Sequence, residues 1–414
     1  MLQAWTTRSC SGFPLAINSA SIRGRWVIRT VRLALNAFPA VPPGLCTAAG
    51  GATDTIEVNL SDLYTYYYLD SWGVRPPDPD PAHFEHVRHL MPGRDFRFAK
   101  NGMGIAKTFK GNKSNELGQA FCRWFLSTYL DTPYHAHIEH VRDHGALVEF
   151  GGASVETTPN STGDAPDYLC ATASNDLSLA EAKGTGHAVG FSAKEFQSWR
   201  DQFDRVRVRD ATGDLLSVKG YIVAMRWASE LDSAKVRTTL SAEDPATPGE
   251  RSVGDEGRGL SYAVKSIHYS SSLQRLRQPL LAAALLRGFR LPGELQFRVV
   301  VWQCMLPPLD KLKFAGGFFP KGADGVLPYQ IADGKLIHTP NDPLRLDISS
   351  GTFFGIELGT LQILAATARV GPGAIEGLRP LEPQPAVYSG LSYLVDGHIL
   401  GPIEFFRPVQ TIDL

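Results

Sequence analysis

Three ionisable residues in the middle of the chain have the types and the spacing needed to cut a phosphodiester bond. Asp167 directly follows Pro166, and further along the chain Glu181 and Lys183 stand on either side of Ala182. Two carboxylates held close together bind Mg²⁺ through oxygen, and the bound ion acidifies a water molecule and offsets negative charge on phosphate. A neighbouring lysine orients that water or neutralises phosphate. These side chains are therefore predicted to form a hydrolytic site.

Two adjacent strands are expected to bring the three side chains together. In residues 177–184, alternation places Glu181 and Lys183 on one face, and small residues on the other face leave room for a helix. Asp167 belongs to a second predicted strand, residues 166–173. A Ser-Asn-Asp turn joins the two, so an antiparallel pair would set Asp167 beside Glu181.

The predicted strands are flanked by segments with the patterns of helices and a further strand. Apolar residues recur at helical spacing over residues 114–129, and Glu116 lies near that inward face. Residues 146–150 have the pattern of a strand. Residues 192–208 are expected to form a second helix, whose basic side chains either approach backbone phosphates or form an ordinary solvated face. The predicted order is helix, three strands, helix, strand.

This order and its residues resemble the PD-(D/E)xK nuclease superfamily. The resemblance rests on Pro166-Asp167, on Glu181-Ala182-Lys183 with Gly184 after the lysine, and on the flanking helices. It covers residues 113–230 alone. It implies an α/β protein with a restriction endonuclease-like core of helix, mixed β-sheet and helix, accompanied by α+β flanking regions.

The resemblance also implies roles for individual residues. Asp167, Glu181 and the Ala182 carbonyl would bind Mg²⁺ or Mn²⁺, Lys183 would position the attacking water, and Glu116 would be an extra acid on the first helix. The implied protein is a metal-dependent endonuclease acting on DNA, a restriction-type or antiphage defence effector with a protein partner or a second copy of itself. Two alternatives keep the fold: a nuclease for RNA or branched DNA, and a nonenzymatic nucleic-acid-binding or scaffold subunit. The alternative for the triplet itself is an exposed ion pair of little energetic value.

The composition restricts where a nucleic acid can bind. Of the 414 residues 43% are hydrophobic, and the formal net charge is -1, so a phosphate-binding surface must be a local patch. The five cysteines are scattered without a CxxC pair, which is typical of reduced thiols in a cytoplasmic protein. No apolar run is long enough to span a bilayer, so a membrane location is not expected.

The regions outside the predicted core carry fewer signals. Residues 1–54 contain several arginines and are expected to be a flexible basic arm or translation from an early start codon, with a targeting segment as the alternative. Residues 55–112 contain a tyrosine-rich stretch, predicted to pack in a core rather than stack on bases, and then a Pro-rich break. Residues 231–262 have the composition of a polar linker. Residues 263–414 are predicted to be an α+β region without a recognisable functional motif; within it we expect a helix near 271–289 and a strand over 295–302.

Histidines supply a competing interpretation. They occur at 83, 86 and 89 and again at 135, 137, 140 and 144. His-x-His on a strand can ligate zinc, but no third-ligand pattern accompanies it. The simpler interpretation is that these histidines lie on the surface or pack in the core.

Overall fold

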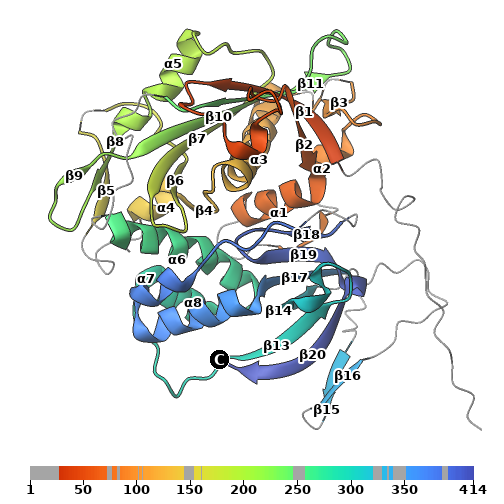
Figure 1. Cartoon of the computed structure of the whole chain (residues 1–414), viewed down its shortest axis with the longest axis vertical. Helices are drawn as coiled ribbons and strands as arrows, with labels where there is room; N and C mark the ends of the chain where they lie inside the picture. The colour runs from red at the N-terminus through yellow and green to blue at the C-terminus, as the bar shows by residue number, and fades with distance from the viewer. Residues whose placement is uncertain are drawn as a thin grey trace, which may run out of the picture.

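The structure, a computed structural model, is mixed α/β. It describes residues 28–71, 77–81, 84–100, 102–104, 106–143, 153–159, 161–245, 257–319, 329–332, 335–338, 351–384 and 390–414. Two large β-sheets lie one above the other in Figure 1, and helices pack against each of them. None of the described helices is both long and apolar enough to cross a bilayer.

The upper sheet has seven strands in the order β2-β1-β12-β10-β7-β6-β4. β4, β6 and β7 form an antiparallel meander, β10 is parallel to β7, and β12 is antiparallel to β10. β1 then pairs parallel with β12, and β2 antiparallel with β1. The strands are β1 (Ile28–Asn36), β2 (Thr55–Asn59), β4 (Tyr134–His137), β6 (Tyr168–Ala171), β7 (Leu177–Thr185), β10 (Lys219–Arg226) and β12 (Thr239–Glu243).

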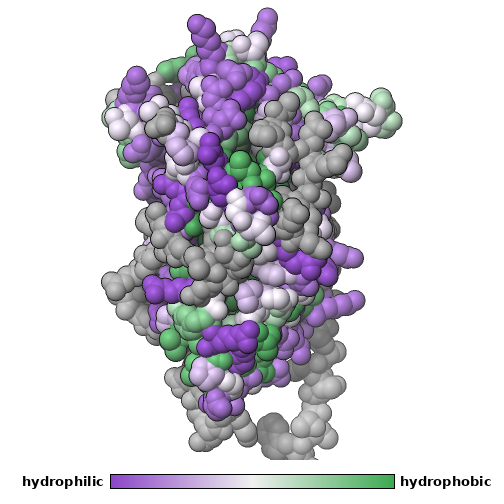
Figure 2. Space-filling model, turned by 90° about the vertical axis from the view of Figure 1, so that its left-hand side faces the viewer, coloured by the Kyte–Doolittle hydropathy of each residue, from purple (hydrophilic) through white to green (hydrophobic). Residues whose placement is uncertain are grey.

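Helices cover the two faces of this sheet unequally. α1 (Leu60–Ser71) and α3 (Lys107–Tyr129) pack on one face, where Phe121 is fully buried against Ala180 and Val223. The short helix α5 (Lys194–Arg200) packs on the other face. Figure 2 views the molecule from the side of α5, and hydrophilic side chains predominate over its upper part. The tyrosines of α1, predicted to be core residues, are buried: Tyr64, Tyr66, Tyr67 and Tyr68.

The lower sheet is antiparallel, with six strands in the order β18-β19-β17-β14-β13-β20. Its strands are β13 (Arg298–Cys304), β14 (Lys313–Phe319), β17 (Thr352–Glu357), β18 (Ser392–Tyr393), β19 (His398–Pro402) and β20 (Phe406–Asp413). The helices beside it are α6 (Arg258–Arg275), α7 (Pro279–Arg287) and α8 (Leu358–Val370), and α6 also contacts β4 and β6 of the upper sheet. This part of the chain therefore combines an antiparallel sheet with helices.

The remaining described elements are short. They include two helices, α2 (Glu85–Arg88) and α4 (Ile138–Asp143). The strands are β3 (Arg97–Phe98), β5 (Ser154–Thr157), β8 (Val206–Arg209), β9 (Leu215–Leu216), β11 (Ala228–Ser229), β15 (Tyr329–Ala332) and β16 (Lys335–His338).

Two strands of the upper sheet come from segments that were not predicted to be structured. β1 lies in the expected basic arm, and β12 lies in the expected polar linker. In both strands every second side chain is buried, including Val31 and Leu33 in β1 and Leu240 and Ala242 in β12. Most of the intervening residues are polar or small, and one of them, Glu243, is covered by Arg200 of α5. A strand that buries only one apolar face can thus have the composition of a loop.

Two predicted helices were wrong in extent. The helix expected over residues 192–208 ends at Arg200, and Val206 and Val208 alternate in β8 with their side chains buried. The helix expected over residues 271–289 is two helices, because Pro279 lacks an amide hydrogen and begins α7. The strand predicted over residues 146–150 lies outside the described residues, and the meander is completed by β4, which was not predicted.

Candidate active site

Asp167 and Glu181 meet where β6 pairs with β7. Tyr168 is in register with Ala180, so Asp167, immediately before β6, comes opposite Glu181. The carboxyl group of Asp167 is close enough to that of Glu181 for its negative charge to raise the pKa of Glu181. Oδ2 of Asp167 also accepts a hydrogen bond from the backbone N–H of Ala182 at 2.8 Å. The antiparallel pair therefore places both acids at one point on the sheet.

Burial shifts the pKa values of the three ionisable groups at this point. Glu181 is 0% exposed, and burial, followed by the negative charge of Asp167, raises its pKa well above the usual range. Burial likewise raises the pKa of Asp167. Burial opposes the charged form of Lys183, yet Glu181 and Asp167 outweigh this effect and raise the lysine's pKa. Lys183 is thus a cation at neutral pH, and its side chain is 24% exposed.

The two acids and the lysine fit a hard divalent cation. Nζ of Lys183 lies against Oε1 of Glu181. Within the described chain, neither carboxylate oxygen of Glu181 has a hydrogen bond of normal geometry. One buried and one half-buried carboxylate beside a single lysine carry an excess negative charge, which must be removed by a proton or balanced by a cation. Asp167 and Glu181 are the residues that would hold Mg²⁺ or Mn²⁺, through the oxygen ligands these ions prefer. Ala182 contributes its amide to Asp167, and metal binding by its carbonyl stays a prediction.

Close contact between α3 and β7 brings a fourth side chain to the acids. A Cβ atom on Gly184 would lie 1.9 Å from the backbone oxygen of Ser114, and one on Gly118 would lie 2.9 Å from the Lys183 backbone. With glycine at both positions the helix approaches the strand closely. Gln119 on α3 consequently donates a hydrogen bond from Nε2 to Oδ1 of Asp167 at 3.3 Å. Gln119 was not predicted, because an amide on a helix face carries no specific signal.

Glu116, the acid predicted on the first helix, has a different partner. Its Oε2 lies 3.3 Å from Nε2 of His86, and its side chain is 41% exposed. The side chain of α3 that contacts Asp167 is Gln119, one helical turn further along. Participation of Glu116 in the site therefore stays a prediction.

An Asp–His pair adjoins the candidate site and was also missed. Oδ1 of Asp70 accepts hydrogen bonds from Nη1 of Arg123 and is paired with Nε2 of His137, each at 2.9 Å. Oδ2 accepts from the hydroxyl of Tyr168, also at 2.9 Å. Burial opposes both charges, but the pair lowers the pKa of Asp70 and raises that of His137. His137 is 37% exposed and close enough to Asp167 to lower that acid's pKa. Asp70 is too distant in sequence for this pairing to be predicted.

The described residues contain one histidine–carboxylate group whose donors converge as metal ligands do, formed by His268, Asp396 and His398. Nε2 of His268 and Nδ1 of His398 each lie 2.9 Å from Oδ2 of Asp396. However, Nδ1 of His268 accepts a hydrogen bond from the backbone N–H of His135 at 3.2 Å. A neutral His268 must then carry its proton on Nε2, where it donates to Asp396 and cannot bind a metal. This group is a hydrogen-bond network that joins α6 to the lower sheet. It also does not correspond to the zinc site considered for the histidines at 83–89 and 135–144.

Comparison with protein-family models, with curated proteins and with solved structures finds no match to this chain. Of the cysteines in the described residues, Cys122, Cys170 and Cys304 are buried, Cys46 is exposed, and all four are free thiols.

Proposed function

We propose that the protein is a metal-dependent phosphodiesterase, an endonuclease of the PD-(D/E)xK type. The observation that carries the proposal is the convergence of the half-buried Asp167 and the buried Glu181, both with raised pKa, beside the protonated Lys183. Perturbed carboxylates next to a fixed cation are more common at functional sites than elsewhere. An exposed surface ion pair, the alternative, would not bury Glu181 completely.

The topology around these residues supports the same proposal. A helix, α3, precedes the antiparallel meander β4-β6-β7, another helix follows it, and β10 then adds parallel to β7. This is the order of helix, mixed sheet and helix implied by the resemblance. The sheet continues beyond that core through β12 and β1, so the unit that would carry the nuclease extends outside residues 113–230.

The residues suggest how the reaction would be divided among them. When bound between Asp167 and Glu181, Mg²⁺ would supply Lewis acidity and a water molecule of lowered pKa. Lys183, held as a cation, would donate hydrogen bonds to that water or to a phosphate oxygen and would not act as a base. Gln119 and the Ala182 amide would fix the rotamer of Asp167.

The test uses the full chain with wild type, Asp167→Asn and Lys183→Ala. Each protein is incubated with linear, nicked and branched DNA and with RNA, with Mg²⁺, with Mn²⁺ or with EDTA. We expect cleavage by the wild type with metal only, and a loss of at least about a hundredfold in both variants. Mn²⁺ binding, followed by electron paramagnetic resonance, should weaken in Asp167→Asn, and circular dichroism should show that both variants fold.

Two results would overturn the proposal: cleavage that survives both substitutions, or a wild type that cleaves no substrate and binds no Mn²⁺. The substrate panel also decides between DNA and RNA. The restriction or antiphage setting, the cytoplasmic location and a protein partner stay predictions from the resemblance.

A further inference from the structure

Lys183 lies on a face of the upper sheet that continues from β7 across β10 and β12 to β1. Alternation gives β7 two faces: Ala180 and Ala182 pack toward α3, whereas Glu181 and Lys183 point to the face of α5. On that face, Arg200 of α5 is anchored by two hydrogen bonds to Glu243 of β12, at 2.8 and 2.9 Å. Glu181 and Glu243 belong to one row of paired residues that crosses the sheet through Ile222. α5 therefore covers this row.

The next row of paired residues across the sheet consists mainly of small side chains. Lys183 is in register with Ala224 of β10, Ala224 with Ser241 of β12, and Ser241 with Ala34 of β1. Ala224 is buried, whereas Ser241 and Ala34 are partly exposed. This row of one lysine and three small residues leads away from the candidate site toward β1.

The row of paired residues beyond that one contains two arginines. Thr185 is in register with Arg226, Arg226 with Thr239, and Thr239 with Arg32. Strands are spaced about 4.8 Å apart, so this row spans about 14 Å from β7 to β1. That length accommodates a short run of successive phosphates of one DNA strand.

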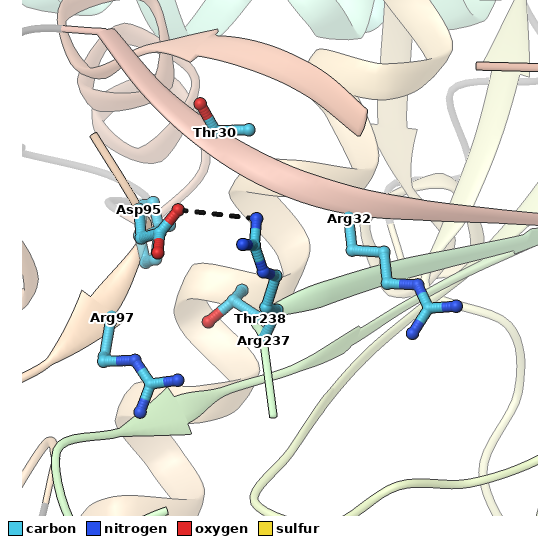
Figure 3. A pocket seen from close by; sticks show the side chains of 7 residues that line it. Thr30, Arg32, Asp95, Arg97, Arg237 and Thr238 are labelled. Carbon is cyan, nitrogen blue, oxygen red and sulfur yellow. Dashed lines mark ion pairs between the residues drawn. The ribbon is translucent and has the colours of Figure 1, made fainter. Parts of the chain in front are cut away.

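The arginines at the far end differ in how firmly they are held (Figure 3). Arg97 donates to the backbone carbonyls of Ser229 at 2.7 Å and Val236, so it fixes the loop that leads into β12. Arg237, 54% exposed, faces Asp95 at 3.8 Å, a solvated pair in which phosphate can replace the carboxylate. Arg32 is exposed and extends away from that pair, and within the described chain it has neither an ion pair nor a hydrogen bond from its side chain.

We propose that this surface, the row Thr185, Arg226, Thr239 and Arg32 together with Arg237, is the track on which the sugar–phosphate backbone of duplex DNA lies. The inference rests on the proposed function, because it supplies the substrate of that site with a place to bind. Arg32 and Arg237 are the side chains of this surface exposed to phosphate oxygens. Arg226, 17% exposed, is paired with Asp232 at 3.6 Å and contributes positive charge from below. The near-neutral net charge of the chain makes such a local basic surface necessary.

The test measures binding without cleavage. A fluorescent DNA duplex is titrated in EDTA with Asp167→Asn and with the same protein carrying Arg32→Gln, Ser241→Glu or Arg298→Gln. Arg298 on β13 is the matched control, an arginine that is 74% exposed and paired with Asp413 on the lower sheet. Arg32→Gln should weaken binding about tenfold at low salt and reduce the slope of log K against log salt by about 0.9, the value for one lost phosphate contact. Ser241→Glu should weaken it at least as much by placing a carboxylate beside the proposed track.

These measurements test the proposed DNA-binding track independently of the proposed cleavage activity. Equal affinity of the Arg32→Gln, Ser241→Glu and Arg298→Gln proteins, with unchanged salt slopes, overturns the track even if the wild type cleaves DNA. Selective weakening by Arg32→Gln and Ser241→Glu supports the track, and it would do so even in a protein without cleavage activity. Thermal unfolding of the three variants identifies any loss of binding that comes from misfolding.

Discussion

At the scale of single residues, the candidate site depends on how the sheet holds Asp167. One oxygen of this carboxylate accepts from the Ala182 amide and the other from Gln119, while Glu181 stands beside it. These two donors fix the side chain in one orientation even though burial disfavours its charge. A carboxylate that is oriented in this way is prepared to bind a cation without rearrangement.

Replacing Gln119 by leucine tests that orientation. The substitution keeps the size of the side chain and removes the hydrogen bond to Oδ1 of Asp167. We expect cleavage and Mn²⁺ affinity to fall by about ten- to a hundredfold, the usual effect of losing a group that orients a metal ligand. Gln410→Leu on the exposed edge of β20 is the control for the change in polarity. Equal activity of the two variants would show that Gln119 does not orient Asp167.

Some of the residues at the candidate site could be predicted from the sequence and others could not, for a physical reason. Asp167, Glu181 and Lys183 lie on two strands joined by a short turn, so local alternation suffices to bring them together. Gln119 and the pair of Asp70 with His137 come from α3, α1 and β4, and their meeting depends on packing between elements. No periodicity within one segment encodes such a contact.

At the scale of elements, the closeness of α3 and β7 positions the site. Gly184 and Gly118 lie where the helix crosses the strand, and the backbone of Ser114 occupies the space that a side chain on Gly184 would need. The β7 strand was predicted nearly to its ends because its alternation is strong. β1 and β12 were missed because each buries one apolar face in a segment that is otherwise polar.

Gly184→Ala tests this contact. The new methyl group would meet the Ser114 backbone, which cannot rotate away, so α3 must move or the strand must bend. We expect the free energy of unfolding to fall by about 3 kcal/mol, measured by urea denaturation, with loss of any cleavage activity. Gly186→Ala is the matched control, since no atom lies within 4 Å of its added Cβ. If the two alanine variants were equally stable, the close crossing of α3 and β7 would be refuted.

At the scale of the whole molecule, buried polar groups connect the two sheets. α6 lies between them, and its His268 contacts Asp396 of the lower region while accepting from the backbone of His135 in β4. Burial lowers the pKa of His268, whereas burial opposes the charge of Asp396 and its histidine partners outweigh that effect, holding its pKa well below the usual range. The fold should therefore be sensitive to acid, since protons are taken up more readily by the unfolded chain.

His135 offers the clearest measurement of this sensitivity. Its ring is 4% exposed, neither ring nitrogen has a hydrogen-bond partner in the described chain, and burial, with the nearby Arg123, lowers its pKa well below the usual value. Because the unfolded chain binds this proton below about pH 6.5 and the folded chain does not, stability is present above that pH and is lost as the pH falls toward the folded-state pKa. The loss for one proton is up to about 1.4 kcal/mol per pH unit.

His135→Phe removes that proton from the unfolded state and leaves an aromatic ring against Tyr168 and His268. Urea denaturation between pH 7 and pH 5 should then show a shallower loss of stability than in the wild type, by up to one proton, with stability at pH 7 equal or higher. His187→Phe is the control, because that histidine is 66% exposed and lies outside the network. An unchanged slope in His135→Phe would mean that His135 is protonated in the folded protein, and the neutral state assigned to it would be wrong. A shallower slope would show that the buried, neutral His135, at the contact between β4 and α6, is one source of the fold's sensitivity to acid.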